Sequence, residues 1–246
     1  MPLETLEAFD IANGIVLIIF CVISIFVGLR LISKYFKYKK RELFLVGLTW
    51  ICMVSPWYPA TISFLMYLFT KRILSPEAYF IISFVFVPIA LVCWMTAFTT
   101  ITENKNQKLI VSFYFILGII YYVFFFYFLY YTDQSLIGQL KGYTDVQYGA
   151  LVVSFYLIAN VTALVTGIIF GRKSRHSENP EIRLKGKFIV IAVIFFFVGS
   201  TLDATIPHNF LTFSIYRTFE ILSAIFFYCG FILPNWIKKY FIERES

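Results

Sequence analysis

The chain has 246 residues, of which 60% are hydrophobic and only 14% are charged, and its formal net charge is +7. A soluble domain contains about 45–50% apolar and about 25% charged residues, so this composition excludes that class. It also excludes intrinsic disorder, which requires low hydrophobicity. The sequence therefore predicts an all-α integral membrane protein, with residues 1–246 forming a single transmembrane domain.

A membrane-spanning helix needs roughly 20 mostly apolar residues, because the hydrocarbon core of a bilayer is about 30 Å thick. Seven segments meet this requirement. The first is too long for the core of a signal peptide and follows acidic residues, so we expect it to be a true span. The predicted spans are 11–32, 43–69, 78–101, 109–131, 148–171, 188–206 and 210–233, with a short tail at 234–246 and long connections only at 132–147 and 172–187.

Basic residues gather in alternate connections, and 17 of the 21 lie on one predicted side. Because Lys and Arg are enriched in cytoplasmic loops, this bias predicts a multi-pass protein of the cell membrane with its N-terminus outside and its C-terminus inside. The bias accounts for the net charge without a nucleic acid partner, and it predicts attraction between the inner face and anionic lipids. The 17 residues are Arg30, Lys34, Lys37, Lys39, Lys40, Arg41, Lys105, Lys108, Arg172, Lys173, Arg175, Arg183, Lys185, Lys187, Lys238, Lys239 and Arg244.

Three ionisable residues fall inside the last two spans: Asp203, Arg217 and Glu220. A charge at the bilayer centre costs about 2.5–3.5 kcal/mol, so such residues face the bundle interior and find partners. Arg217 and Glu220 share a helix face at a spacing of three, and Asp203 lies across the short hairpin 207–209. We expect one cluster in the outer half of the membrane. It is either an ion-paired clamp between two helices or a polar site, and its net charge of −1 favours a site for a cation or proton.

Prolines interrupt the second and third spans, Pro56 and Pro59 in the second and Pro88 in the third. Each removes a backbone donor and kinks its helix. Carbonyls freed at membrane depth must face protein or a water-filled cavity. The kinks therefore either shape the bundle or border an aromatic pocket between the second, third and seventh spans. The aromatic residues near them are Trp57, Tyr58 and Trp94.

Two further spans carry unusual side chains. Residues 113–131 of the fourth span include twelve Phe or Tyr, which favours packing against lipid and neighbouring helices, with a ligand-facing wall as the alternative. Asn160, in the middle of the fifth span, is expected to form an interhelical hydrogen bond or to contact a ligand.

The residues needed for several kinds of chemistry are missing from the sequence. It contains two histidines, and all four cysteines lie inside predicted spans, so we expect no metal site. It contains no nucleophile motif of a hydrolase and no phosphate-binding loop. We therefore predict a protein that is not an enzyme and that needs no cofactor.

Several scattered residues carry a resemblance to a known family. The chain resembles the seven-helix input domains at the N-terminus of some bacterial and archaeal histidine kinases, and it is similar to G-protein-coupled receptors in topology only. A kinase would continue into a dimerisation helix, whereas this chain stops ten residues after Trp236. The resemblance thus implies a free-standing relative, or one that signals through a separate partner. The residues that carry it are Pro88, Trp94, Phe98, Arg183, Leu184, Lys185, Gly186, Glu220, Tyr228 and Pro234.

Together these observations predict a receptor-like sensor. It would bind a small or lipidic ligand in an outer-half cavity beside the intramembrane charges and the kinked spans. The connection 172–187 and the tail 236–246 would report binding to a cytoplasmic or membrane partner. The alternatives are a small transporter or channel that uses Asp203, Arg217 and Glu220 as an ion or proton relay, and a membrane scaffold without a small-molecule site.

Overall fold

The computed structural model describes residues 7–132, 134–141, 146–206 and 209–242. Within these residues the chain contains seven helical stretches that are long and apolar enough to cross a membrane, in agreement with the all-α membrane class. The hairpin residues Pro207 and His208 lie outside the described part. The seven stretches are α1 (Ala8–Tyr38), α2 (Arg41–Met53) with α3 (Tyr58–Thr70), α4 (Pro76–Phe84) with α5 (Phe86–Ile101), α6 (Gln107–Tyr131), α7 (Ala150–Arg175), α8 (Pro180–Thr205) and α9 (Phe210–Ile232).

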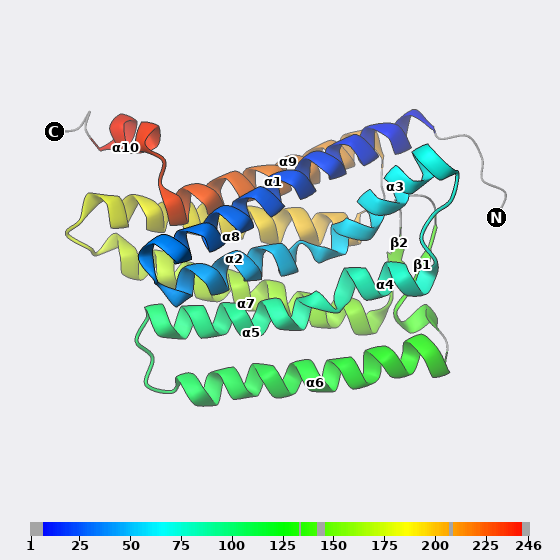
Figure 1. Cartoon of the computed structure of the whole chain (residues 1–246), viewed down its shortest axis with the longest axis horizontal. Coiled ribbons are helices and arrows are strands. Elements are labelled where there is room, and N and C mark those ends of the chain that lie inside the picture. The colour runs from blue at the N-terminus through cyan, green and yellow to red at the C-terminus, as the bar shows by residue number, and fades with distance from the viewer. Residues whose placement is uncertain (1–6, 133, 142–145, 207–208, 243–246) are drawn as a thin grey trace.

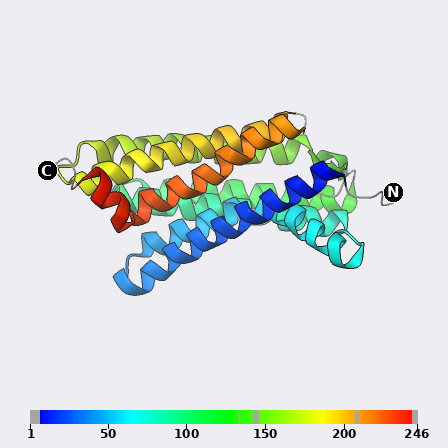
Figure 2. The same cartoon turned by 90° about the horizontal axis from the view of Figure 1, so that it is seen from above.

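The helices run side by side along the long axis of the molecule, and the two chain ends lie at opposite ends of it (Figure 1). Neighbouring helices form a closed ring: α1 packs on α2 and α9, α2 on α5, α5 on α7, α7 on α8, and α8 on α9. Helix α6 lies at the edge of the bundle, mainly against α5 (Figure 1). In Figure 2, α1 and α9 are both tilted in the same direction relative to the long axis of the bundle. The interior of the ring is where a site can form.

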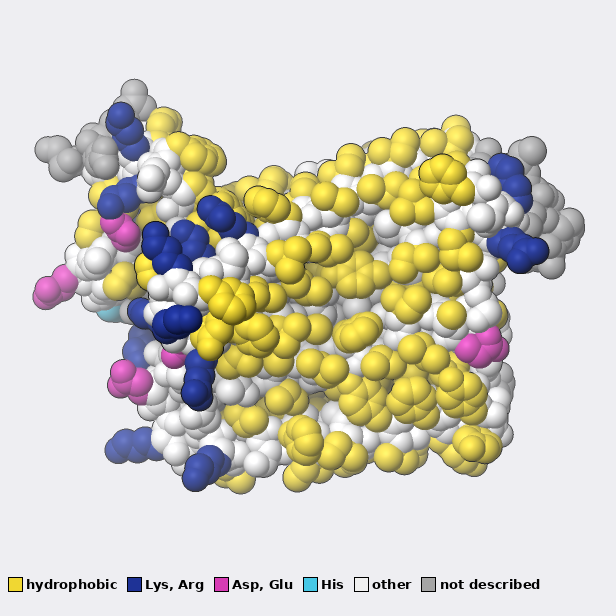
Figure 3. Space-filling view, in the orientation of Figure 1, with side chains coloured by type: hydrophobic (Ala, Val, Ile, Leu, Met, Phe, Trp, Pro, Cys, Tyr) yellow, Lys and Arg dark blue, Asp and Glu magenta, His cyan; other side chains and the backbone are white. Residues whose placement is uncertain are grey.

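Charge distinguishes the two ends of the bundle. Lys and Arg side chains gather mainly at the end that holds the C-terminus, which we call the basic end (Figure 3). The opposite end carries a short antiparallel pair, β1 (Gly138–Leu140) and β2 (Val146–Tyr148), after the 3-10 turn η2 (Gln134–Leu136), and we call it the hairpin end. The apolar flank between the two ends is the surface that a bilayer would cover (Figure 3).

The fifth span begins later than predicted. Tyr148 was expected to start this helix, but it is paired with Gly138 in the β-hairpin, and α7 begins at Ala150. The cause is a backbone hydrogen bond, since the Gly149 N–H donates to the Ile137 carbonyl at 2.7 Å and holds the chain against η2 until the helix starts. Tyr148 therefore belongs to the β-hairpin and not to a helix.

The basic end is more helical than expected. The predicted connection 172–187 is reduced to residues 176–179, because α7 extends to Arg175 and α8 begins at Pro180. Asn179 explains the early start: its side-chain oxygen accepts the Glu181 N–H at 2.8 Å, and proline follows it at the first helical position.

The tail after α9 forms a further short helix, α10 (Asn235–Phe241), which lies across the basic end (Figure 1). Leu233 ends α9 in a left-handed conformation, and Pro234 turns the chain. An ion pair between Lys238 and Glu181 then ties α10 to the first turn of α8.

The predicted proline kinks are present, and side-chain hydroxyl groups bond to carbonyls next to them. The second span breaks at the 3-10 turn η1 (Ser55–Trp57), and the third breaks at Val85, three residues before Pro88. Hydroxyl groups satisfy carbonyls next to both breaks. Ser55 donates to the Ser83 carbonyl at 2.7 Å, Tyr58 to the Ile51 carbonyl at 2.7 Å and Tyr122 to the Val85 carbonyl at 2.5 Å.

Tyr58→Phe tests this role. It removes the hydroxyl that bonds to Ile51 and keeps the ring, so we expect a loss of about 1 kcal/mol in the free energy of unfolding. Denaturation of the purified protein in detergent measures the loss. Tyr127→Phe, on the exposed face of α6, is the matched control and should leave stability unchanged.

The aromatic fourth span packs with one face only. Its buried residues recur every three or four positions, at Gly118, Tyr121, Phe125 and Leu129. The Tyr121 ring stacks on Phe155 of α7 with centroids 4.1 Å apart. Most of the other aromatic side chains point away from the bundle, as expected for a helix that packs against lipid.

Candidate functional site

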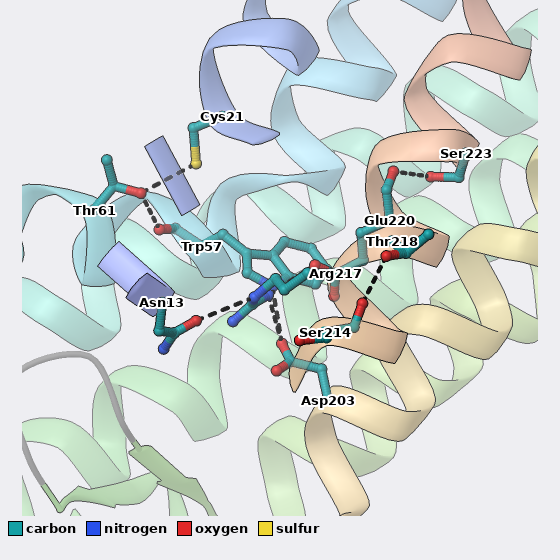
Figure 4. A network of polar contacts seen from close by, with 10 residues as sticks. All are labelled: Asn13, Cys21, Trp57, Thr61, Asp203, Ser214, Arg217, Thr218, Glu220 and Ser223. Atoms are coloured by element: carbon teal, nitrogen blue, oxygen red, sulfur yellow. Dashed lines mark hydrogen bonds and ion pairs between the residues drawn. The ribbon is translucent and has the colours of Figure 1, made fainter. Parts of the chain in front are cut away.

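The three predicted intramembrane charges meet in one network (Figure 4). The Arg217 guanidinium Nη1 lies 2.7 Å from Glu220 Oε2 and 3.3 Å from Asp203 Oδ2. The Arg217 Nε donates to Asn13 Oδ1 at 3.3 Å, so α1 joins α8 and α9. Sequence reasoning missed Asn13, although an amide inside an apolar span is the kind of residue that needs an interhelical partner.

Close helix packing buries this network. Arg217 is 4% exposed and Glu220 is fully buried. Gly199 of α8 faces them, and a Cβ at this position would lie 3.0 Å from the Glu220 Cγ and 3.1 Å from the Tyr216 carbonyl oxygen. Glycine at 199 therefore allows α8 and α9 to approach at the level of the charges, where a water-poor setting strengthens each interaction and makes an unpaired charge costly.

Trp57 extends the network to the kink of the second span. Its indole N–H donates to Asp203 Oδ2 at 2.8 Å. Its backbone carbonyl accepts the Thr61 hydroxyl at 3.1 Å, and that hydroxyl lies 3.2 Å from Cys21 Sγ of α1 (Figure 4). The proline kink thus places an aromatic donor against a carboxylate that is 146 positions away in the chain.

A cavity of about 180 Å³ lies beside this network, and we call it the hairpin-end cavity. Its walls come from η1, the end of α4, β2, α7 and α8. Asp203 is the charged residue among its described lining residues, whereas Arg217 and Glu220 lie behind Asp203 and do not reach it. The other polar lining residues are Tyr148, Tyr156, Asn160, Ser200, Thr201 and Thr205.

The hairpin-end cavity opens on the flank between α7 and α8. Val153 and Leu157 of α7 line it and are 36% and 47% exposed on the apolar surface. Thr205, the last residue of α8, is also an exposed lining residue. A molecule can therefore reach Asp203 from the side of the bundle.

A second, smaller cavity of about 40 Å³ lies in the middle of the bundle. Trp50, Phe196 and Phe227 line it and form what we call the aromatic plug. Trp50 stacks on Phe227 with ring centroids 4.1 Å apart and lies 5.4 Å from Phe196. Asn160 lines both this cavity and the hairpin-end cavity, so it marks the boundary between them.

A third cavity, of about 450 Å³, lies at the basic end. It begins one helical turn beyond the middle cavity, since Val46, Ile189 and Phe231 line it next to Trp50, Val193 and Phe227. Helices α7 and α8 line all three cavities. The charged residues of the basic-end cavity are Lys40, Glu42, Glu103 and Lys185.

The remaining predicted residues lie apart from the charge network. The Trp94 indole donates to the Thr166 hydroxyl at 2.7 Å and lines the middle cavity. Tyr58 lines none of the three cavities, because its hydroxyl bonds to the Ile51 carbonyl at the kink. The predicted aromatic residues are therefore distributed over two cavities and a kink.

Fold and composition together define the class, a multi-pass membrane protein with seven candidate membrane-spanning helices in its described residues. The chain matches no protein-family model and no curated protein sequence at a significant level. Its function is therefore inferred from the cavities and from the residues that line them.

Proposed function

We propose that this protein is a seven-helix membrane sensor, similar in organisation to the input domains of histidine kinases. It binds a small or lipidic ligand in the hairpin-end cavity and signals to a separate partner at the basic end. One observation carries the proposal. A cavity with a carboxylate in its wall is separated from the basic-end cavity by the small middle cavity and its aromatic plug, so it is closed toward the basic end as a receptor pocket is.

In this proposal the hairpin end faces outside and the basic end faces the cytoplasm. The gathering of Lys and Arg at the basic end supports this orientation (Figure 3). The same residues would attract anionic lipids of the inner leaflet. The ligand then enters from the outer solution or the outer leaflet.

Helix α8 provides the route for the signal. It contributes Asp203 to the hairpin-end cavity, Phe196 to the plug and Lys185 to the basic-end cavity. A ligand beside Asp203 would act on the same rigid element whose first turn holds α10 through Glu181 and Lys238. Signalling requires that the ligand favour one of two arrangements of α8, since a ligand that binds both equally shifts nothing.

Cysteine accessibility tests the proposal. In a variant whose four native cysteines are replaced, single cysteines are placed at Thr201 in the hairpin-end cavity, Ala159 in the middle cavity and Thr100 in the basic-end cavity. With a membrane-impermeant thiol reagent, we expect labelling at 201 from outside only, at 100 from inside only, and at 159 from neither side. Protection of position 201 from both sides would contradict a ligand cavity.

A small transporter is the second candidate, and one observation favours it. The three cavities follow one another along α7 and α8 and together extend from the hairpin end to the basic end. A transporter must open the aromatic plug during its cycle, so a cysteine at Ala159 would become labelled from both sides. The accessibility of this position distinguishes the two functions.

A further inference from the structure

We propose that the hairpin-end cavity binds an organic ammonium ion, with the charged nitrogen next to Asp203 and Trp57. This assignment of a ligand class rests on the proposed function. Four features of the cavity support it: the charge of the adjoining network, the aromatic walls, a buried acceptor and the size of the cavity.

The charge of the network favours a cation. Arg217 is its only guanidinium, and it holds two carboxylates, with the shorter contact to Glu220 and the longer one, of 3.3 Å, to Asp203. The formal sum of the three groups is −1. Asp203 is the member that lines the cavity, so the excess negative charge is presented there. In a water-poor site a cation next to Asp203 is therefore stabilised.

Four aromatic residues line the same cavity: Trp57, Phe84, Tyr148 and Tyr156. Trp57 and Tyr156 meet edge to face with centroids 6.3 Å apart, and Phe84 meets Tyr148 in the same way at 5.3 Å. Aromatic faces attract ammonium groups, and cages of aromatic rings recognise quaternary ammonium ions. The walls thus suit a cation that carries carbon groups.

A buried acceptor points to a ligand independently. Asn160 is 4% exposed and lines the cavity, where its side chain interacts with Tyr156, and its Oδ1 accepts no hydrogen bond of standard geometry from the described residues. Buried polar atoms in native structures are almost always paired. An N–H or O–H group on the bound ammonium compound would donate to this oxygen.

The size and polarity of the hairpin-end cavity favour an organic cation over a metal ion. A volume of about 180 Å³ accommodates a compact organic ammonium group. A metal ion such as Ca²⁺ needs six to eight oxygen ligands, whereas this cavity presents one carboxylate among mainly apolar walls. The cavity also opens between α7 and α8 onto the apolar flank, so the ammonium group could belong to a free solute or to a lipid headgroup.

Two thiol reagents of similar size and opposite charge test the proposal. In the variant with a single cysteine at Thr201, we measure labelling from outside by a trimethylammonium-ethyl and by a sulfonato-ethyl methanethiosulfonate. Each rate is normalised to the rate with a small free thiol. We expect the cationic reagent to be favoured roughly tenfold, because the carboxylate is close and poorly screened. Adding Asp203→Asn should reduce the preference to less than about twofold.

A matched control distinguishes the effect of the carboxylate in the cavity from that of a carboxylate outside the cavity at the same end. Glu77→Gln removes a carboxylate at the same end of the bundle but outside the cavity, and it should leave the preference unchanged. Equal normalised rates for both reagents, or a preference that persists without the Asp203 carboxylate, would overturn the ammonium assignment while the cavity itself stands. Failure of both reagents to label position 201 would instead contradict the proposed function.

Protection of the cysteine at position 201 by added ammonium compounds distinguishes a free solute from a lipid headgroup as the ligand. Protection of position 201 by tetramethylammonium supports a free solute as ligand. Protection only by dodecyltrimethylammonium in the vesicle membrane supports a lipid-like ligand that enters between α7 and α8. Protection by neither compound, or equally by the anionic dodecyl sulfate, would overturn the proposal.

Discussion

Arg217→Leu is expected to lower the free energy of unfolding by about 3–5 kcal/mol, because it leaves Asp203 and Glu220 buried next to each other without their shared cation. The loss should exceed that of any other single change in the network, since the guanidinium also bonds to Asn13 and so joins three helices. Unfolding of the purified protein in mixed micelles, followed by circular dichroism, measures the change.

The combined variant Arg217→Leu, Asp203→Asn, Glu220→Gln is the control. It removes all three charges together, so no ion remains uncompensated, and most of the lost stability should return. If the triple variant is as unstable as Arg217→Leu alone, then the arginine acts through packing and not through charge. If Arg217→Leu is as stable as the natural chain, the buried network does not form.

Gly47→Ala is expected to destabilise the protein by about 1–3 kcal/mol through overpacking. Helices α1 and α2 are in close contact at Gly28 and Gly47, and a Cβ at 47 would lie 2.6 Å from the Gly28 carbonyl oxygen. The backbone cannot yield as a flexible side chain can, so α1 must move away from α2. Since α1 carries Asn13, the contact to Arg217 should weaken as well.

Gly118→Ala is the matched control for this substitution. It lies in the middle of α6, where an added Cβ meets only the Pro88 Cβ at 3.2 Å. There the higher helix propensity of alanine should offset the contact, so stability should be unchanged or slightly greater. Equal losses for Gly47→Ala and Gly118→Ala in the same unfolding assay would contradict the close approach of α1 and α2.

The three charged residues of the network differ in their surroundings. Arg217 and Glu220 are buried at the interface of α1, α8 and α9, which is the geometry of a clamp. Asp203 belongs to the same network but also lines the hairpin-end cavity. The buried network is therefore adjacent to the cavity in which we propose that the ligand binds, and a ligand at Asp203 would act directly on the interaction that joins α8 to α9.

The sequence predicted the membrane class, the broad positions of the seven spans and the meeting of three charges. These follow from strong local rules: a bilayer requires long apolar segments, and an ion inside one requires a partner. The spacing of Arg217 and Glu220 placed them on one helix face. The break at Pro56 was also predicted from the chemistry of proline.

Other features depend on residues far apart in the chain and left no periodic signal. Asn13 reaches Arg217, and Trp57 reaches Asp203, only because the ring of helices closes α1 onto α9 and brings η1 to α8. The same closure decides that Asp203 lines a cavity and that Trp94 lines a different one.

The sequence alone thus determined the class of protein and the residues that cannot face lipid, because the cost of a polar group in hydrocarbon depends on that residue and its depth. The tertiary structure decided which of these residues share a site. Partner choice in a bundle is set by side-chain packing between helices, as at Gly28 with Gly47 and at Gly199 with Glu220, and this packing has no counterpart in the pattern of a single helix.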